Sequence, residues 1–394
     1  MNQAALTIGS GAVRQGYSEN PDPREAVTEL AAQVMQPSMS LVAFFCSPAY
    51  DLEQIDEEIR AQFPAVQVIG CTTAGEITQD GYKENSISGF SLGAPDFKAH
   101  HALITDLAHF EIEQGSARVL EILHRLNPCN AANSLLARST FGMLLIDGMS
   151  KQEELVVSAL NGAIDPIPLF GGSAGDGLKF SSTKVYCDGA FHDNAAVFTL
   201  VQTSFAFNVF KFEHFHPTGK KMVVTEADPN RRLVMEINAE NAAQEYARLV
   251  GLEEHQLGPE IFAAYPVMVR VGGEYHVRSI QQVEGDGSLR FYCAIDEGLV
   301  LTLGEGQEAS RSLDTALGLL KSRLGPVQLI LVFDCILQRI EAEQKQTVRA
   351  ISKTFRKHKV VGFSTYGEQY RSMHVNQTFT GVAIGTERIS QEGR

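Results

Sequence analysis

The 394-residue sequence lacks the motifs that mark several common classes of protein. It has no Walker loop, and none of its glycine-rich stretches combines GxGxxG spacing with a following helix, which excludes the usual nucleotide and dinucleotide sites. Its six cysteines are scattered without a CxxC pair, which excludes zinc ribbons and covalent c-type haem attachment and favours a reducing compartment. No apolar run approaches the length of a membrane span, and the first residues show no signal-peptide pattern.

Positive charge is also scarce. Lys and Arg number 33 against 47 Asp and Glu, which gives a formal net charge of −14. Such a balance argues against nucleic acid or an anionic membrane as the main partner. We therefore expect an acidic cytoplasmic protein, and its 44% hydrophobic content is enough for more than one buried core.

What the sequence does contain is one short pattern in three copies. Two apolar residues lead into a glycine, small or hydroxyl-bearing residues follow, and a second glycine precedes an acid. The copies are residues 68–76, 169–176 and 360–368. Each copy predicts a buried strand that ends in a tight, ligand-sized loop.

The segments around these loops repeat as well. Each loop is preceded by an apolar strand and an amphipathic helix, with a further helix upstream, and is followed by another apolar strand. In the second unit, Ser150 and Glu153 predict a capping box at the start of the helix. The last residues of the first strands, Cys46, Asp147 and Asp334, precede the loop glycines Gly70, Gly171 and Gly362 by 24, 24 and 28 residues.

The sequence therefore predicts an α/β (α+β) fold. Three diverged units of helix, strand, helix, strand, loop and strand should form mixed sheets flanked by helices, with central, buried strands. We expect two domains. Residues 1–202 should hold the first two units, and residues 203–394 should hold a β-rich meander, 203–300, followed by the third unit.

The three loops also resemble a known family. Cys-Thr-Thr-Ala-Gly-Glu at 71–76 and Gly-Gly-Ser-Ala-Gly-Asp at 171–176 are similar to the N-terminal half of FIST proteins, and Gly-Phe-Ser-Thr-Tyr-Gly-Glu at 362–368 to the C-terminal half. FIST proteins are sensory, ligand-binding modules. The resemblance implies a sensor rather than an enzyme, acting on a partner histidine kinase, cyclase or phosphodiesterase, with a homo-oligomer left open.

Two short segments look most like one branch of that family. The segments are His-Phe-His-Pro-Thr at 214–218 and Phe-His-Asp-Asn at 191–194. The branch they resemble is the nitric-oxide-sensing NosP proteins, which bind haem. This implies a non-covalent haem b whose iron would bind nitric oxide.

A histidine beside an apolar wall could supply the neutral nitrogen that haem iron binds. His192 and His374 stand at equivalent places in two units, each two residues before an asparagine that opens the last strand, and His192 is the first candidate for the iron. His214 and His216 are two apart and face one side of an extended strand. The alternative for each is an ordinary histidine that bonds the backbone.

The alternative hypothesis is a haem-free sensor, in which the glycine loops would hold a small metabolite such as an amino acid. A hydrolase has least support, because nothing pairs a loop nucleophile with a base. The loop residues could also simply fill tight turns. The predicted ligand-binding residues are Gly70, Cys71, Thr72, Gly75, Glu76, Gly171, Gly172, Asp176, Gly367 and Glu368.

Overall fold

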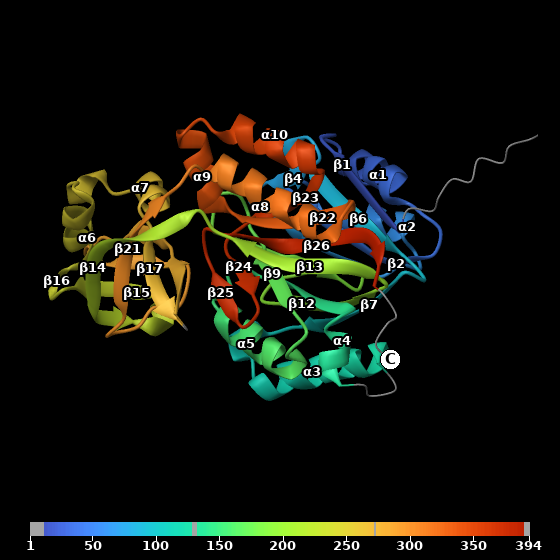
Figure 1. Cartoon of the computed structure of the whole chain (residues 1–394), viewed down its shortest axis with the longest axis horizontal. Helices are drawn as coiled ribbons and strands as arrows, with labels where there is room; N and C mark the ends of the chain where they lie inside the picture. Colours follow the sequence, from blue (N-terminus) through green and yellow to red (C-terminus); the bar gives the residue numbers. More distant parts are fainter. Residues whose placement is uncertain (1–11, 128–131, 272, 390–394) are drawn as a thin grey trace, which may run out of the picture.

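The structure is a computed structural model that describes residues 12–127, 132–271 and 273–389. A body of three mixed sheets carries helices on its outside, and a smaller β-rich lobe projects from one end (Figure 1). The predicted fold class is confirmed. Cys129 lies outside the described residues.

The first unit shows the arrangement that all three units share. Strand β2 (Met39–Cys46) runs parallel to β3 (Val68–Thr72) and antiparallel to β6 (Ile87–Gly93), and β1 (Val13–Ser18) pairs with β6 at the edge. Helix α2 (Leu52–Gln62) connects β2 to β3, and begins where the Asp51 carboxylate accepts the Glu53 and Gln54 amides. Helices α1 (Pro23–Val34) and α2 cover the outer face.

The other two units repeat this order. The second has strands β8 (Thr140–Ile146), β9 (Leu169–Ser173), β12 (Ala196–Thr203) and edge strand β7 (Phe97–Ile104), with η1 (Leu107–His109), α3 (Ile112–Leu126), α4 (Asn133–Leu136) and α5 (Glu153–Ile164). The third has β22 (Val327–Cys335), β23 (Val360–Thr365), β26 (Phe379–Arg388) and edge strand β13 (Phe205–Phe212), with α8 (Ala309–Leu324), α9 (Ile336–Gln344) and α10 (Val348–His358). Its first strand and loop lie farther apart in sequence because two helices, α9 and α10, connect β22 to β23.

Each glycine loop leads into a short hairpin that joins the sheet of another unit. The first hairpin enters the third sheet, the second enters the first sheet, and the third enters the second sheet. Each unit therefore adds a hairpin to the sheet of another unit, and the three exchanges form a closed ring. The hairpins are β4 (Glu76–Thr78) with β5 (Gly81–Lys83), β10 (Val185–Cys187) with β11 (Ala190–His192), and β24 (Glu368–Tyr370) with β25 (Met373–Val375), bound through the pairs β4–β23, β10–β3 and β24–β9.

The inner faces of the three sheets share one apolar core. Phe45 of the first unit stacks on Phe363 of the third with ring centroids 4.7 Å apart, and Phe170 of the second lies 5.4 Å from Phe333. The outer faces are covered by helices, so the central strands are buried on both sides, as their continuous apolar runs predicted.

The first glycine of each loop lies inside a strand at an equivalent position. A Cβ at Gly70, Gly171 or Gly362 would come within 2.6, 2.6 and 1.7 Å of a carbonyl oxygen on the neighbouring parallel strand. These glycines therefore allow the two parallel strands of each unit to approach closely.

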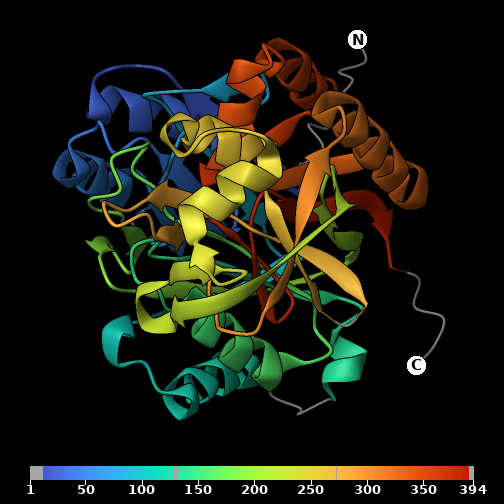
Figure 2. The ribbon, with the colours of Figure 1, turned by 90° about the vertical axis from the view of Figure 1, so that its left-hand side faces the viewer.

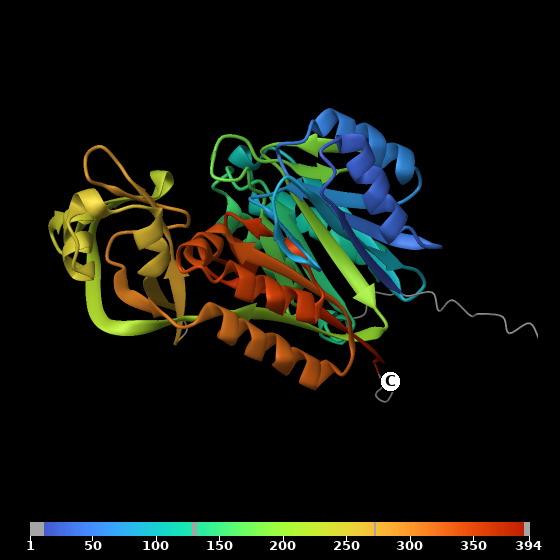
Figure 3. The ribbon, with the colours of Figure 1, turned by 90° about the horizontal axis from the view of Figure 1, so that it is seen from above.

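The lobe is a second sheet system with its own core, seen in front in Figure 2. Two strands, β14 and β21, connect it to the body (Figure 3). In the part of the chain that the structure describes, no helix is both long and apolar enough to cross a membrane. The lobe consists of β14 (Phe215–Asp228), η2 (Pro229–Arg231), β15 (Leu233–Ile237), β16 (Glu240–Asn241), α6 (Ala242–Val250), η3 (Glu254–Gln256), α7 (Pro259–Ala264), β17 (Val267–Val271), β18 (Glu274–Arg278), β19 (Ile280–Val283), β20 (Leu289–Phe291) and β21 (Val300–Gly306).

Two local predictions are wrong. The capping box at Ser150 and Glu153 is not formed, because α5 begins at Glu153 and that carboxylate is 2.7 Å from Arg232 of the lobe. The asparagines before the last strands are also not all equivalent. The residue of positive φ at that place is Asn85 or Asn194 in the first two units, but in the third it is Gln377, one residue after Asn376.

Candidate functional site

The three glycine loops meet where the sheets converge and hydrogen-bond to one another. Each loop gives backbone bonds to the next, so the ring formed by the hairpins is repeated at the level of single peptide groups. The bonds run from Ala74 N to Ser364 O at 2.9 Å, Ser364 N to Gly75 O at 2.7 Å, Ser173 N to Gly367 O at 2.9 Å and Gly175 N to Thr72 O at 3.0 Å.

A pocket of about 310 Å³ opens beside this ring, at the low end of the range of roughly 300–1,000 Å³ for small-molecule sites. All three units contribute to its wall. Residues 47–49, 73–75 and 84–85 come from the first unit, residues 176–179 from the second, and Ile336, Arg339, Ile340 and Glu343 from helix α9 of the third.

The wall includes the cationic side chain of Arg339, which is only 8% exposed. Its guanidinium donates to Glu84 at 2.6 Å and to Glu343 at 3.2 Å, and lies over the Tyr82 ring at 5.5 Å. Both partner carboxylates are exposed, at 68% and 53%. Exposed ion pairs contribute only about 0.2–1 kcal/mol, so an incoming carboxylate could replace either partner at small cost.

Glycine at position 75 leaves room for the Arg339 guanidinium to lie against the first loop. Its φ of +127° is rare for residues with a side chain, and a Cβ there would stand 1.9 Å from the Arg339 Nη1. The close approach of an arginine from another unit therefore explains the second glycine of the pattern in this loop.

Asp176 shapes the second loop. Its carboxylate accepts the Phe180, Ser181 and Ser182 amides at 2.8–2.9 Å and also the Tyr366 hydroxyl. Burial alone would raise the pKa of Asp176, but these hydrogen bonds outweigh it and hold that pKa below its ordinary value. The residue lines the pocket while its oxygens already bind the loop.

Glu76 and Glu368, the acids of the other two loops, are fully buried in matching surroundings and do not line the pocket. Glu76 accepts from the Thr73 hydroxyl at 2.5 Å and the Ser86 hydroxyl at 2.6 Å, and Glu368 accepts from Thr365 and Thr378 at the same sequence offsets. Burial raises the pKa of Glu76 to about 7 and that of Glu368 well above its usual range, against the effect of these hydrogen bonds.

The pocket therefore combines charges of both signs. Arg339 and the exposed Lys179 are cationic, and Glu84 and Glu343 are anionic. This arrangement suits a small ligand that carries a carboxylate and an ammonium group together.

Of the ten predicted ligand-binding residues, Gly75 and Asp176 line this pocket. The remaining eight are buried in strands or directly beside them, where their contacts are packing and hydrogen bonds within the protein, and ligand binding by them stays a prediction. They are Gly70, Cys71 and Thr72 in β3, Glu76 in β4, Gly171 and Gly172 in β9, Gly367 before β24, and Glu368 in β24.

The predicted equivalence of His192 and His374 is wrong by one residue, although both lie in the second strand of an exchanged hairpin. His374 pairs with Gln369, which stands opposite Gly171, whereas the residue that pairs with Tyr186 opposite Gly70 is Phe191. His192 is half-buried, and its Nε2 bonds the Cys187 carbonyl at 3.1 Å. His374 is fully enclosed, its Nδ1 accepts from Gln369 at 3.2 Å, and burial lowers its pKa to about 4.

His214 and His216 lie where the chain enters the lobe. His214 is buried, with Nε2 2.8 Å from the Glu341 carboxylate, and lines an apolar pocket of about 280 Å³. His216 is 48% exposed near Glu305. An iron ligand needs a free nitrogen that faces a wide apolar slot. His214 offers one such nitrogen, its Nδ1, which is buried without a hydrogen-bond partner, but the 280 Å³ pocket beside it would have to widen to admit a tetrapyrrole.

Sequence reasoning missed Arg339. The residue lies in a helix of the third unit, more than 250 residues from Gly75, and nothing in its own neighbourhood marks it. The one signal was the glycine before Glu76, which indicates that something must come close to that backbone.

Comparison with known protein families places two domains on the chain. The FIST N domain matches residues 40–240, more than half of the sequence, and the FIST C domain matches residues 242–371. A comparison with curated proteins gives no match for this chain. The matched ranges contain all three glycine loops and the whole pocket. The chain therefore belongs to the FIST family, whose domains are sensory, ligand-binding domains of signal transduction rather than catalysts.

Proposed function

We propose that the protein senses a small amphoteric metabolite, such as an amino acid, in the pocket between the three units. The observation that carries this proposal is Arg339, a nearly buried guanidinium in a wall to which every unit contributes. The ligand carboxylate would bind Arg339 and Lys179, and its ammonium group would bind Glu84 and Glu343, the acids that Arg339 contacts without ligand.

A ligand there could act on the lobe through a shared apolar cluster. Ala74 and Tyr366 of two loops pack in that cluster with Ile336 and Leu337 of α9 and with Ala263 of α7 in the lobe. Ligand binding can shift the lobe only by the difference in affinity between two arrangements of these parts. We propose that the lobe then changes its contact with a partner, either a histidine kinase or a cyclase or phosphodiesterase.

The test is a thermal-shift screen of the full chain with the twenty amino acids and simple carboxylates, followed by calorimetry of any hit. Arg339→Ala should weaken binding at least about tenfold, because a hydrogen bond to a charged group contributes about 1.5–3 kcal/mol. Arg339→Lys should restore part of the affinity. Arg118→Ala, which removes an exposed arginine on α3, is the control and should bind normally. A screen without a hit, or equal binding by Arg339→Ala, would contradict the proposal.

Haem-based sensing of nitric oxide, as in the NosP branch, is the second proposal. What supports it is His214, whose Nδ1 is buried without a hydrogen-bond partner beside an apolar pocket lined by Phe212, Leu313 and Phe379. The test is the absorption spectrum of protein expressed with haem supplied, before and after nitric oxide. A Soret band that is lost in His214→Ala and kept in His192→Ala would favour this proposal over the first. A colourless protein would end it.

A further inference from the structure

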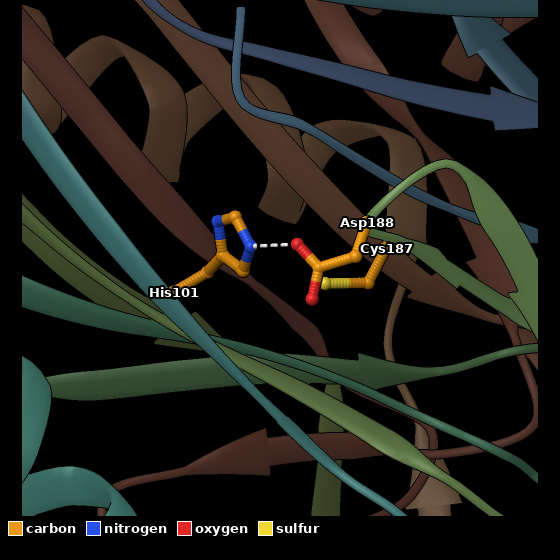
Figure 4. Close-up of side chains that lie close together, drawn as sticks. All are labelled: His101, Cys187 and Asp188. Atoms are coloured by element: carbon orange, nitrogen blue, oxygen red, sulfur yellow. Dashed lines mark hydrogen bonds and ion pairs between the residues drawn. The ribbon is translucent and has the colours of Figure 1, made fainter. Parts of the chain in front are cut away.

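A second pocket, of about 490 Å³, lies against the hairpin that the second unit lends to the first sheet. Its wall includes His101 of β7 and Asp188, the residue that follows β10. Neither residue belongs to the pocket that contains Arg339. Cys187, the last residue of β10, stands directly beside them (Figure 4).

These three side chains present three different metal-binding atoms to one another. The ring nitrogen of His101, the sulfur of Cys187 and a carboxylate oxygen of Asp188 all lie within 4.8 Å of each other. The His101 Nε2 and an Asp188 oxygen are 2.9 Å apart. His101 lies in β7 of the second sheet, and Cys187 ends β10 in the first sheet, 86 residues later in the sequence. The chain therefore brings His101 to Cys187 and Asp188 only through the hairpin exchange.

The local backbone favours this arrangement. Asp188 and Gly189 both have positive φ, +53° and +79°, as in the tight turns that connect two-residue hairpins. Such a turn places the Asp188 carboxylate beside the end of β10, although the side chain stays exposed. Cys187 is fully buried, and burial raises the pKa of its thiol, so the thiol is protonated before a metal binds.

We propose that His101, Cys187 and Asp188 form a binding site for a divalent transition metal, with Zn²⁺ as the best match. Nitrogen, thiolate and carboxylate ligands with a tetrahedral arrangement are typical of zinc, and three protein ligands leave a fourth position for water or a small molecule from the pocket. On binding, the metal–sulfur bond replaces the S–H bond and the proton leaves to solvent. Zinc–ligand bonds of about 2.0–2.3 Å in a tetrahedral arrangement require donor atoms roughly 3.5 Å apart. The His101 nitrogen and the Asp188 oxygen, now 2.9 Å apart, would therefore separate slightly to admit the metal.

The experiment uses the full chain after treatment with EDTA, titrated with Co²⁺ and then with Zn²⁺. Cobalt reports the site because a bound thiolate gives near-ultraviolet charge-transfer absorption and tetrahedral geometry gives intense visible bands. We expect one Co²⁺ per chain with both signals, and their loss when Zn²⁺ displaces cobalt. Absence of the thiolate band in the wild-type protein would overturn the proposal.

Variants assign the ligands. Asp188→Asn is the safest, because the residue is exposed and asparagine tolerates positive φ. It should weaken Co²⁺ binding at least about tenfold, since even indirect partners of a metal contribute 10–100-fold. Cys187→Ser should remove the thiolate band. Cys293→Ser, a buried thiol in the lobe, and His109→Ala, an exposed histidine, are matched controls and should bind like wild type. Unchanged cobalt affinity in Asp188→Asn would contradict the assignment even if Cys187→Ser fails to fold.

Discussion

Replacing Gly75 by alanine tests whether this glycine is needed for the close approach of Arg339, beyond the strain that any side chain would suffer at a positive φ. The new Cβ would stand 1.9 Å from Nη1 of Arg339, so the guanidinium must retreat by roughly 1.5 Å to reach ordinary contact. The positive φ of the residue adds about 1–3 kcal/mol of backbone strain. Loss of the ion pairs with Glu84 and Glu343 adds about 0.2–1 kcal/mol each. We therefore expect the free energy of unfolding to fall by about 1.5–5 kcal/mol.

Gly177→Ala is the matched control for this change. Gly177 lines the same pocket with a φ of +74°, but no atom lies within 4 Å of its Cβ position. The free energy of unfolding of Gly177→Ala should fall only by about 1–2 kcal/mol, the cost of a left-handed conformation for a residue with a side chain. Urea unfolding measures both variants, and calorimetry with an amino acid found in the screen measures binding. Gly75→Ala should bind at least about tenfold more weakly, since a charged hydrogen bond of about 1.5–3 kcal/mol is lost, and Gly177→Ala should keep its affinity. Equal losses of stability and of affinity in the two variants would refute the role of Arg339.

Three further predictions concern buried polar groups. The pKa of His374 is lowered to about 4 in the folded protein from 6.5, so wild-type stability should fall by about 3 kcal/mol as pH drops from 6.5 to 4. His374→Gln should flatten that fall in urea unfolding at several pH values, and an unchanged slope would contradict the assignment. The pKa of Glu76 is raised to about 7 from 4.5, so its contribution has the opposite sign, and stability is lost as pH rises through this window. Glu76→Gln should gain about 3 kcal/mol on wild type between pH 4.5 and 8, and a constant difference would show that Glu76 does not titrate there. Tyr366→Phe removes a hydroxyl donor from Asp176 and should lower the free energy of unfolding in urea by about 1.5–3 kcal/mol. A change below about 0.5 kcal/mol, the level of a surface substitution, would mean that this hydrogen bond contributes little.

The three-unit fold could be predicted because its signals are local. Continuous apolar runs marked the buried strands, and Gly70, Gly171 and Gly362 marked the points where two parallel strands come close. The exchange of hairpins could not be predicted in the same way. Its strands are three residues long, too short to show alternation, and their partners belong to other units.

The site was only partly predictable for the same reason. Gly75 and Asp176 carry the pattern of the loop, but Arg339 reaches them from a distant helix. His192 and His374 show the limit of repeat arguments. Counting back from Asn194 and Asn376 makes them equivalent, but in the hairpins His374 corresponds to Phe191. The two imidazoles therefore face opposite sides of their hairpins, and His374 is enclosed whereas His192 is half-buried.

Amide hydrogen exchange with a saturating amino-acid ligand tests the central claim most directly, because it reports every segment of the wall at once. If the pocket between the units is the sensory site, protection should increase together in residues 73–85, 176–182 and 336–343, and exchange should change in α7 of the lobe, which shares the apolar cluster beneath them. Protection confined to residues 209–216 around His214, or to one unit alone, would contradict it.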